Sequence, residues 1–133
     1  MPIADRPTTY LAALLAGAGA AHFLVPRPFD TTVPPWLPGR ARTYTRVSGA
    51  VELLLAAGVA VPATRRVSAR AAAGLFVAVF PANVQMAYDW RKRPAPLKAA
   101  ALARLPLQLP LVAWAEKVSR TARRAGTGAD TGR

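Results

Sequence analysis

Five polar side chains inside long apolar runs are the residues best suited to chemistry: His22, Glu52, Asn83, Arg104 and Gln108. A carboxylate in an apolar helix is costly unless it faces a partner or water. We therefore predict that Glu52 points into the protein interior toward Arg104, with Gln108 one helical turn from Arg104. Glu52 is then either a proton-titrating or cation-binding group, or half of a buried pair that fixes helix register.

His22 and Asn83 each allow a structural and a functional interpretation. His22 contacts a ligand or relays protons, or it is a hydrogen-bonded histidine at the membrane interface. Asn83 follows Pro81 by two residues, so its amide either bonds a carbonyl freed by a proline kink or contacts a headgroup or ligand. Counting along the helices places all five polar residues in one half of the domain. We therefore predict a ligand or proton site in that half.

The apolar runs that carry these residues have the length of membrane spans. Arg46 to Arg65 and Arg70 to Asp89 are each close to the ~20 residues that a helix needs to cross a bilayer. We predict an all-α fold, a four-transmembrane-helix bundle in residues 1–116, with helices at about 8–25, 42–61, 68–88 and 97–115. The fourth is alternatively a re-entrant or surface helix, because prolines interrupt it.

The first apolar run carries signals for its start and its packing. Thr8 is a candidate helix cap. Ala13, Gly17 and Ala21 form a stripe of small residues that favours close helix packing in lipid. The alternative is a cleavable signal peptide, since small residues resembling a cleavage site occur near its end. The apolar runs that follow favour a retained helix.

Two segments are predicted to lie outside the helices. Residues 26–42 are rich in proline, which disfavours a regular helix, and their apolar side chains suit the headgroup zone. Pro34, Pro35 and Trp36 are therefore predicted to act as a lid over one mouth of the bundle. Residues 117–133 are basic and then rich in Gly and Thr, which predicts a disordered tail.

Composition narrows the class of protein. Hydrophobic residues make up 53% of the chain, yet the net charge is +12. The cations cluster between uncharged runs, as in loops of membrane proteins, and aromatic rings do not alternate with them, so a nucleic-acid partner is not expected. The absence of cysteine excludes disulfides and thiol chemistry within the chain. With one histidine and few acids, no metal site is predicted.

The residues at the ends of the apolar runs indicate where in the cell the protein resides. Tyrosine and tryptophan occur at the ends of the apolar runs, where such rings favour the bilayer interface. We expect a multi-pass protein of the inner (plasma) membrane, with the lipid bilayer as its main partner. The cations slightly favour cytoplasmic termini. The sequence does not define an oligomeric state.

Several short motifs together resemble the DoxX-like family of small four-helix bacterial membrane proteins. They are Gly-Ala-Ala-His-Phe-Leu-Val-Pro at 19–26, Val-Pro-Pro-Trp-Leu-Pro at 33–38, Ser-Gly-Ala-Val-Glu-Leu at 48–53, Pro-Ala-Thr-Arg-Arg at 62–66 and Phe-Pro-Ala-Asn-Val-Gln-Met-Ala at 80–87. The resemblance covers about residues 8–116. It carries over the positions His22, Pro26, Trp36, Glu52, Pro81 and Asn83.

The resemblance implies a link to thiosulfate:quinone oxidoreduction or oxidative-stress complexes. It leads to an expected accessory subunit that binds a lipid- or quinone-like molecule, with a membrane redox complex as a further partner. The alternatives are a catalytic oxidoreductase subunit and a small proton-coupled transporter. No other cofactor is evident from the sequence.

Overall fold

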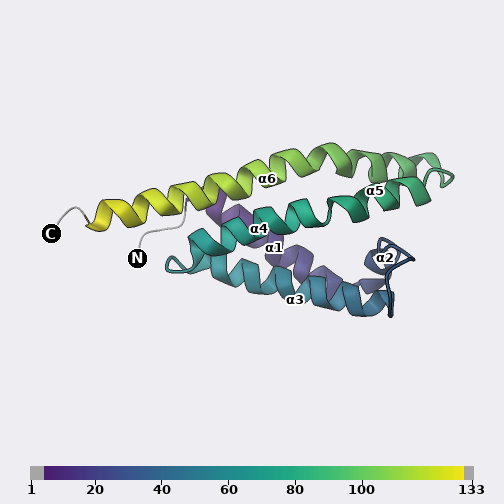
Figure 1. Ribbon diagram of the computed structural model, residues 1–133, viewed down its shortest axis with the longest axis horizontal. Coiled ribbons are helices and arrows are strands. Elements are labelled where there is room, and N and C mark those ends of the chain that lie inside the picture. Colours follow the sequence, from purple (N-terminus) through teal and green to yellow (C-terminus); the bar gives the residue numbers. More distant parts are fainter. Residues whose placement is uncertain (1–4, 131–133) are drawn as a thin grey trace.

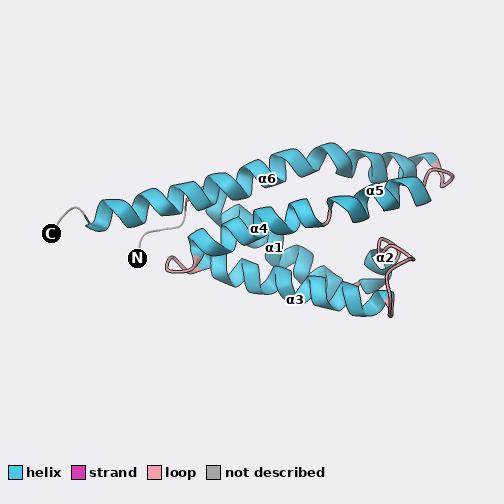
Figure 2. Ribbon diagram, in the orientation of Figure 1, coloured by secondary structure: helices cyan, strands magenta, loops and turns pink. Residues whose placement is uncertain are grey.

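The computed structural model describes residues 5–130, and the regular secondary structure in this part of the chain is helical (Figures 1 and 2). Its helices are α1 (Arg6–Leu24), α2 (Pro26–Asp30), α3 (Ala41–Ala60), α4 (Arg65–Ala78), α5 (Phe80–Asp89) and α6 (Ala95–Asp130). The start of α1 and the end of α6 lie at the same end of the molecule (Figure 1). Residues 1–4 and 131–133, which include parts of the predicted polar start and tail, lie outside the described residues.

The start of α1 is fixed by a side chain one turn before the predicted cap. The Thr8 backbone N–H donates to the Asp5 carboxylate over 3.0 Å, so Asp5 is the N-cap in place of Thr8. Hydrogen bonds from Thr8 lower the pKa of Asp5, because they favour the charged carboxylate. Thr8 is itself buried.

Two helix pairs form the core, with α1 packed on α3 and α4 packed on α6. Leu11 and Leu15 of α1, Val59 of α3 and Val118 of α6 are almost completely buried. The core face of α4 is built from Ala69, Ala72 and Ala73, whose small side chains let its neighbours approach closely. Alanine therefore contributes here through close backbone packing as well as through helix propensity.

Glycines bring α1 and α3 together. A Cβ atom added at Gly19 would lie 2.9 Å from the Gly49 carbonyl oxygen, and one at Gly49 would lie 2.7 Å from His22 Cβ. The predicted stripe is wrong, because a Cβ at Gly17 would meet no atom within 4 Å. The contact face of α1 is instead the row that contains Leu11, Leu15 and Gly19.

The proline-rich segment 26–42 was predicted to contain no regular helix, but its first five residues form α2. Pro26 opens α2 at a position where the missing N–H is not needed, so the turn forms in spite of its prolines. The hydroxyl groups of Thr31 and Thr32 donate to the Pro28 and Phe29 carbonyls over 2.6 and 2.7 Å. These bonds satisfy carbonyls at the end of α2 that have no helical partner.

The third predicted helix, 68–88, is two helices in the structure. α4 ends at Ala78 and α5 begins at Phe80, with Val79 as the residue between them. Pro81 lies in the first turn of α5, where it cannot continue the hydrogen-bond ladder of the preceding helix. The break therefore follows from the position of this proline.

The predicted disordered tail is wrong for the described residues. α6 runs without interruption from Ala95 to Asp130 and includes Pro106 and Pro110. Val118 and Ser119 are buried, so tertiary packing holds the helix beyond residue 116.

The predicted four-transmembrane bundle is also wrong. Among the described residues one stretch is long and apolar enough to cross a membrane, the 25 residues Arg65–Asp89 of α4 and α5. Polar side chains interrupt the other long helices, as His22 does in α1, Glu52 in α3 and Arg104 in α6. We call Arg65–Asp89 the candidate span.

The contact between Gly19 and Gly49 gives a stability test. We expect Gly49→Ala to destabilise the fold by about 1–3 kcal/mol, because the new methyl group overlaps His22 and Phe23. Gly17→Ala is the matched control, and its site is open, so it should be neutral or slightly stabilising. Thermal unfolding in detergent, followed by circular dichroism, measures both. A Gly49→Ala protein that melts at or above the wild-type temperature would contradict this packing.

Candidate functional site

A cavity of about 480 Å³ opens where the α1–α3 pair meets α4, α5 and α6. This volume is in the range of small-molecule sites. Side chains from all six helices and from the 31–40 connection line it: Ala18, His22, Phe29, Thr32, Val33, Pro34, Leu37, Tyr44, Thr45, Val47, Ser48, Val51, Glu52, Leu75, Ala78, Val79, Ala82, Asn83 and Arg104. Four of the five predicted site residues thus meet at one cavity, and Gln108 lies behind Asn83.

His22 and Glu52 form the polar centre of the cavity. His22 Nδ1 lies 3.0 Å from Glu52 Oε2 and 2.7 Å from the Ala18 carbonyl oxygen. One Nδ1 proton thus faces two acceptors, and Glu52 Oε2 is buried without a well-aligned hydrogen bond. The pair can hold one shared proton, or Glu52 can accept a hydrogen bond from a molecule in the cavity.

An aromatic contact positions the imidazole. The Phe29 ring of α2 stacks on the His22 ring with 3.8 Å between their centroids and 24° between their planes. Stacking on one face and the Ala18 carbonyl at Nδ1 restrict the rotation of the ring. The short helix α2 therefore sets the orientation of His22.

Arg104 does not form the predicted ion pair with Glu52. Its Nη1 donates to Met86 Sδ over 3.9 Å, and His22 is the ion-pair partner of Glu52 among the described residues. Arg104 is an exposed residue of α6 at the cavity margin. Its guanidinium still supplies a positive charge at the cavity.

Asn83 and Gln108 form a buried amide pair. Asn83 Nδ2 donates to Gln108 Oε1 over 3.2 Å, so the Asn83 amide does not bond a carbonyl freed by Pro81. Gln108 Nε2 is buried and has no acceptor. An unpaired buried donor is costly, but Gln108 does not line the cavity, so this amide is not open to a molecule bound there.

The connection after α2 covers the cavity through a network that sequence analysis missed. The Thr45 hydroxyl donates to Asp30 Oδ1 over 2.6 Å, and Arg42 Nε donates to Asp30 Oδ2 over 2.9 Å. Asp30 thereby joins α2 to the first turns of α3. The sequence signal for this network was the Asp30 carboxylate within a proline-rich segment. Its partners are 12 and 15 residues further along the chain, and they come close only because the connection folds back onto α3.

The predicted lid residues separate into two groups. Pro34 is buried and lines the cavity, together with Val33 and Leu37. Pro35 and Trp36 are exposed and do not line it, and the Trp36 side chain is 68% exposed. The cover of the cavity is therefore the segment around Pro34, and its role as a lid stays a prediction.

The lining of the cavity combines polar groups with apolar walls. Within residues 5–130 no group of three His, Asp or Glu side chains is placed to hold a metal ion. The cavity offers one acid–imidazole pair, one guanidinium and the Asn83 amide, with apolar walls. Such a set provides hydrogen-bonding groups at one end of the cavity and apolar contact along the rest.

These features define an all-helical protein with one candidate span and a polar-centred cavity. The chain belongs to the family described as Domain of unknown function (DUF8561), whose model matches residues 11–119. This match overturns the resemblance to the DoxX-like family, whose supporting motifs are short and rich in Gly, Ala and Pro, as in many packed helices. No curated protein and no solved structure matches the chain.

The Asp30 network predicts a dependence of stability on pH. The Thr45 hydroxyl and Arg42 lower the pKa of Asp30 below its ordinary value of 3.8. A carboxyl with a lowered folded-state pKa stabilises the protein above its unfolded pKa, and this contribution is lost as pH falls through the folded pKa. We expect Asp30→Asn to lower the melting temperature at pH 7 and the difference to shrink below pH 3.8.

Asp89→Asn is the matched control for this measurement, because Asp89 bonds only the exposed Gln85 side chain at the end of α5. Thermal melts of the wild type and both variants across the acid range give the result. A constant difference between wild type and Asp30→Asn at every pH would contradict the assigned role.

Proposed function

We propose that this protein resides in the inner membrane and binds a lipid- or quinone-like molecule in the His22–Glu52 cavity as a binding or accessory subunit. The observation that carries the proposal is Glu52 Oε2, a buried carboxylate oxygen without a well-aligned donor beside a cavity with apolar walls. A bound head group that donates a hydrogen bond would satisfy this atom.

Outward-facing apolar residues support the membrane location. In the most apolar window of the candidate span 28% of the residues are buried, whereas the core helix of a soluble protein would be mostly buried. Leu54 of α3 and Leu109 of α6 are 73% and 77% exposed, so apolar side chains also face outward elsewhere. Exposed apolar surface of this extent is typical of contact with a membrane or a partner.

The lining of the cavity supports an amphipathic ligand. Val51, Leu75 and Val79 offer apolar contact, and His22, Glu52 and Arg104 offer hydrogen bonds or charge. A lipid or quinone combines a long apolar part with a small polar head, which matches this division. The link to redox complexes came from the corrected resemblance and is not part of this proposal.

The proposed orientation is based on the end of the molecule where α1 begins and α6 ends. The end of the molecule at which α1 starts and α6 ends also holds the turn before Arg65. Among the described residues it carries eight arginine and lysine residues, against seven at the opposite end when Arg46 and Arg104, which lie further along α3 and α6, are left out. By the positive-inside rule we place this end in the cytoplasm.

An acidic residue in the middle of the candidate span tests the membrane location. Val77 is at the centre of Arg65–Asp89 and is 57% exposed, so Val77→Asp would place a carboxylate near the bilayer midplane at a cost of about 2.5–3.5 kcal/mol. We expect this variant to leave the carbonate-resistant membrane fraction. Val67→Asp, at the edge of the span, is the control and should stay there. Wild-type protein in the soluble fraction would contradict the location.

Neutralising Glu52 tests the binding site. We expect Glu52→Gln to retain about tenfold less co-purified lipid or quinone, since a hydrogen bond to a charged group contributes about 1.5–3 kcal/mol. Asp89→Asn removes an exposed carboxylate at the end of α5 that does not line the cavity, and it serves as the control. Extraction and mass spectrometry identify and quantify the molecule, with melting temperature measured alongside. Equal retention in wild type and Glu52→Gln, or a more stable Glu52→Leu with unchanged retention, would assign Glu52 a structural role instead.

A further inference from the structure

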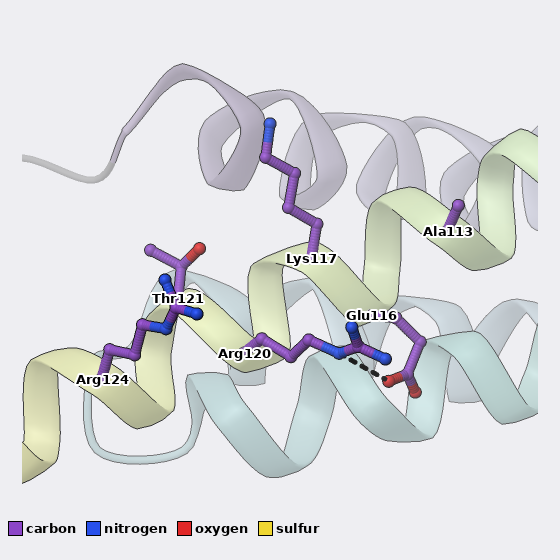
Figure 3. Close-up of a pocket in the computed structure, with 6 residues that line it drawn as sticks. All are labelled: Ala113, Glu116, Lys117, Arg120, Thr121 and Arg124. Carbon is purple, nitrogen blue, oxygen red and sulfur yellow. Dashed lines mark ion pairs between the residues drawn. The ribbon is translucent and has the colours of Figure 1, made fainter.

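The second half of α6 presents a basic surface at the end of the molecule opposite the cavity. Lys117, Arg120, Arg123 and Arg124 are all exposed, and between Trp114 and Gly128 the sole carboxylate is Glu116. Figure 3 shows Arg120 extended toward Glu116, to which it makes a 3.9 Å ion pair, while Lys117 points away from that pair. The Arg123 and Arg124 side chains form no hydrogen bond or ion pair with the described chain. We call these four cations the α6 basic surface.

A hydrogen bond fixes the position of the α6 basic surface along the axis of the candidate span. The Ser119 hydroxyl donates to the Arg66 carbonyl over 3.0 Å, and Arg66 is the second residue of the span. α6 runs antiparallel to α4, so residues after Ser119 extend past the start of the span (Figure 1). At ~1.5 Å per residue, α6 reaches roughly 13 Å beyond this level by Gly128. That distance covers the headgroup layer of a bilayer.

Aromatic residues lie just inside this level, because Trp114 is five residues before Ser119 on α6. Trp114 Nε1 donates to the Pro7 carbonyl over 2.9 Å, which ties α6 to the start of α1. Tyr10, on the next turn of α1, is 60% exposed and lines a hollow together with Trp114 and Lys117. Amphipathic rings favour the boundary between hydrocarbon and head groups. Cations just beyond such rings are therefore placed beside lipid phosphates.

We infer that the α6 basic surface binds the phosphate groups of anionic phospholipids at the membrane surface. The inference rests on the membrane location proposed above. Lys117, Arg120, Thr121 and Arg124 line one hollow on α6, although the Arg120 guanidinium itself extends toward Glu116 (Figure 3). Charge attraction to anionic lipid adds favourably for each basic residue near the surface.

A nucleic acid fits this surface less well. Single-stranded nucleic acids are held by aromatic rings that alternate with cations. After Trp114 the sequence of α6 contains no aromatic residue, and the Trp114 indole already bonds Pro7. Cations without neighbouring aromatic rings therefore favour lipid phosphates as the partner of α6. Nucleic acid becomes an outcome for the experiment to exclude.

Charge reversal on α6 tests the inference with the full chain in neutral detergent. Phosphatidylglycerol is titrated against phosphatidylcholine, and native mass spectrometry reports the lipids bound. We expect the wild type to prefer phosphatidylglycerol and the double variant Arg120→Glu/Arg124→Glu to bind it at least about tenfold more weakly. Its melting temperature and carbonate-resistant membrane fraction should stay unchanged, which separates this result from a failure to fold or to enter the membrane.

Arg91→Glu/Arg93→Glu is the matched control, because it makes the same change in net charge at the opposite end of the molecule. In the wild type these two cations lie over the Tyr88 and Trp90 rings. The control should keep the lipid preference. An undiminished preference in the α6 variant, or an equal loss in both variants, would overturn the inference. Displacement of phosphatidylglycerol by an oligonucleotide at equal phosphate concentration would assign the surface to nucleic acid instead.

Discussion

The contact between α1 and α3 at Gly19 and Gly49 is the constraint on which the candidate site depends. Neither position has room for a Cβ atom, so the two backbones approach closely. This approach brings His22 of α1 within 3.0 Å of Glu52 of α3. A wider spacing would leave each polar group alone among apolar side chains, which is costly. Helix packing and the polar centre of the cavity therefore have one structural cause.

Two carboxylates near the cavity have opposite surroundings. Asp30 accepts hydrogen bonds from Thr45 and Arg42, and its role is to hold the connection after α2 over the cavity. Glu52 has one oxygen buried without a well-aligned donor. A satisfied carboxylate stabilises a fold, whereas an unsatisfied one stores free energy that a bound molecule can release. This difference separates the structural acid from the candidate binding acid.

α6 connects two kinds of surface along one helix. Near its start Arg104 reaches the cavity margin, and near its end Lys117, Arg120 and Arg124 form an exposed basic surface. Between them, Trp114 and Ser119 tie the helix to α1 and α4 through hydrogen bonds. These bonds fix the positions of the cavity margin and the basic surface along the axis of the candidate span. The cavity and the α6 basic surface are thus independent in chemistry, but the hydrogen bonds of α6 hold them at a fixed distance from each other.

The sequence by itself determined the helical class and the approximate positions of the long helices, because apolar runs and prolines act locally. It also indicated that His22, Glu52, Asn83 and Arg104 lie in one half of the domain, since depth follows from counting residues along helices. It did not determine that Glu52 faces His22 and not Arg104, or that Asp30 binds Thr45. It also misjudged residues 117–130, whose composition suggests disorder but whose Val118 and Ser119 are buried. These features depend on helix rotation and on contacts between distant segments, and only tertiary packing decides both.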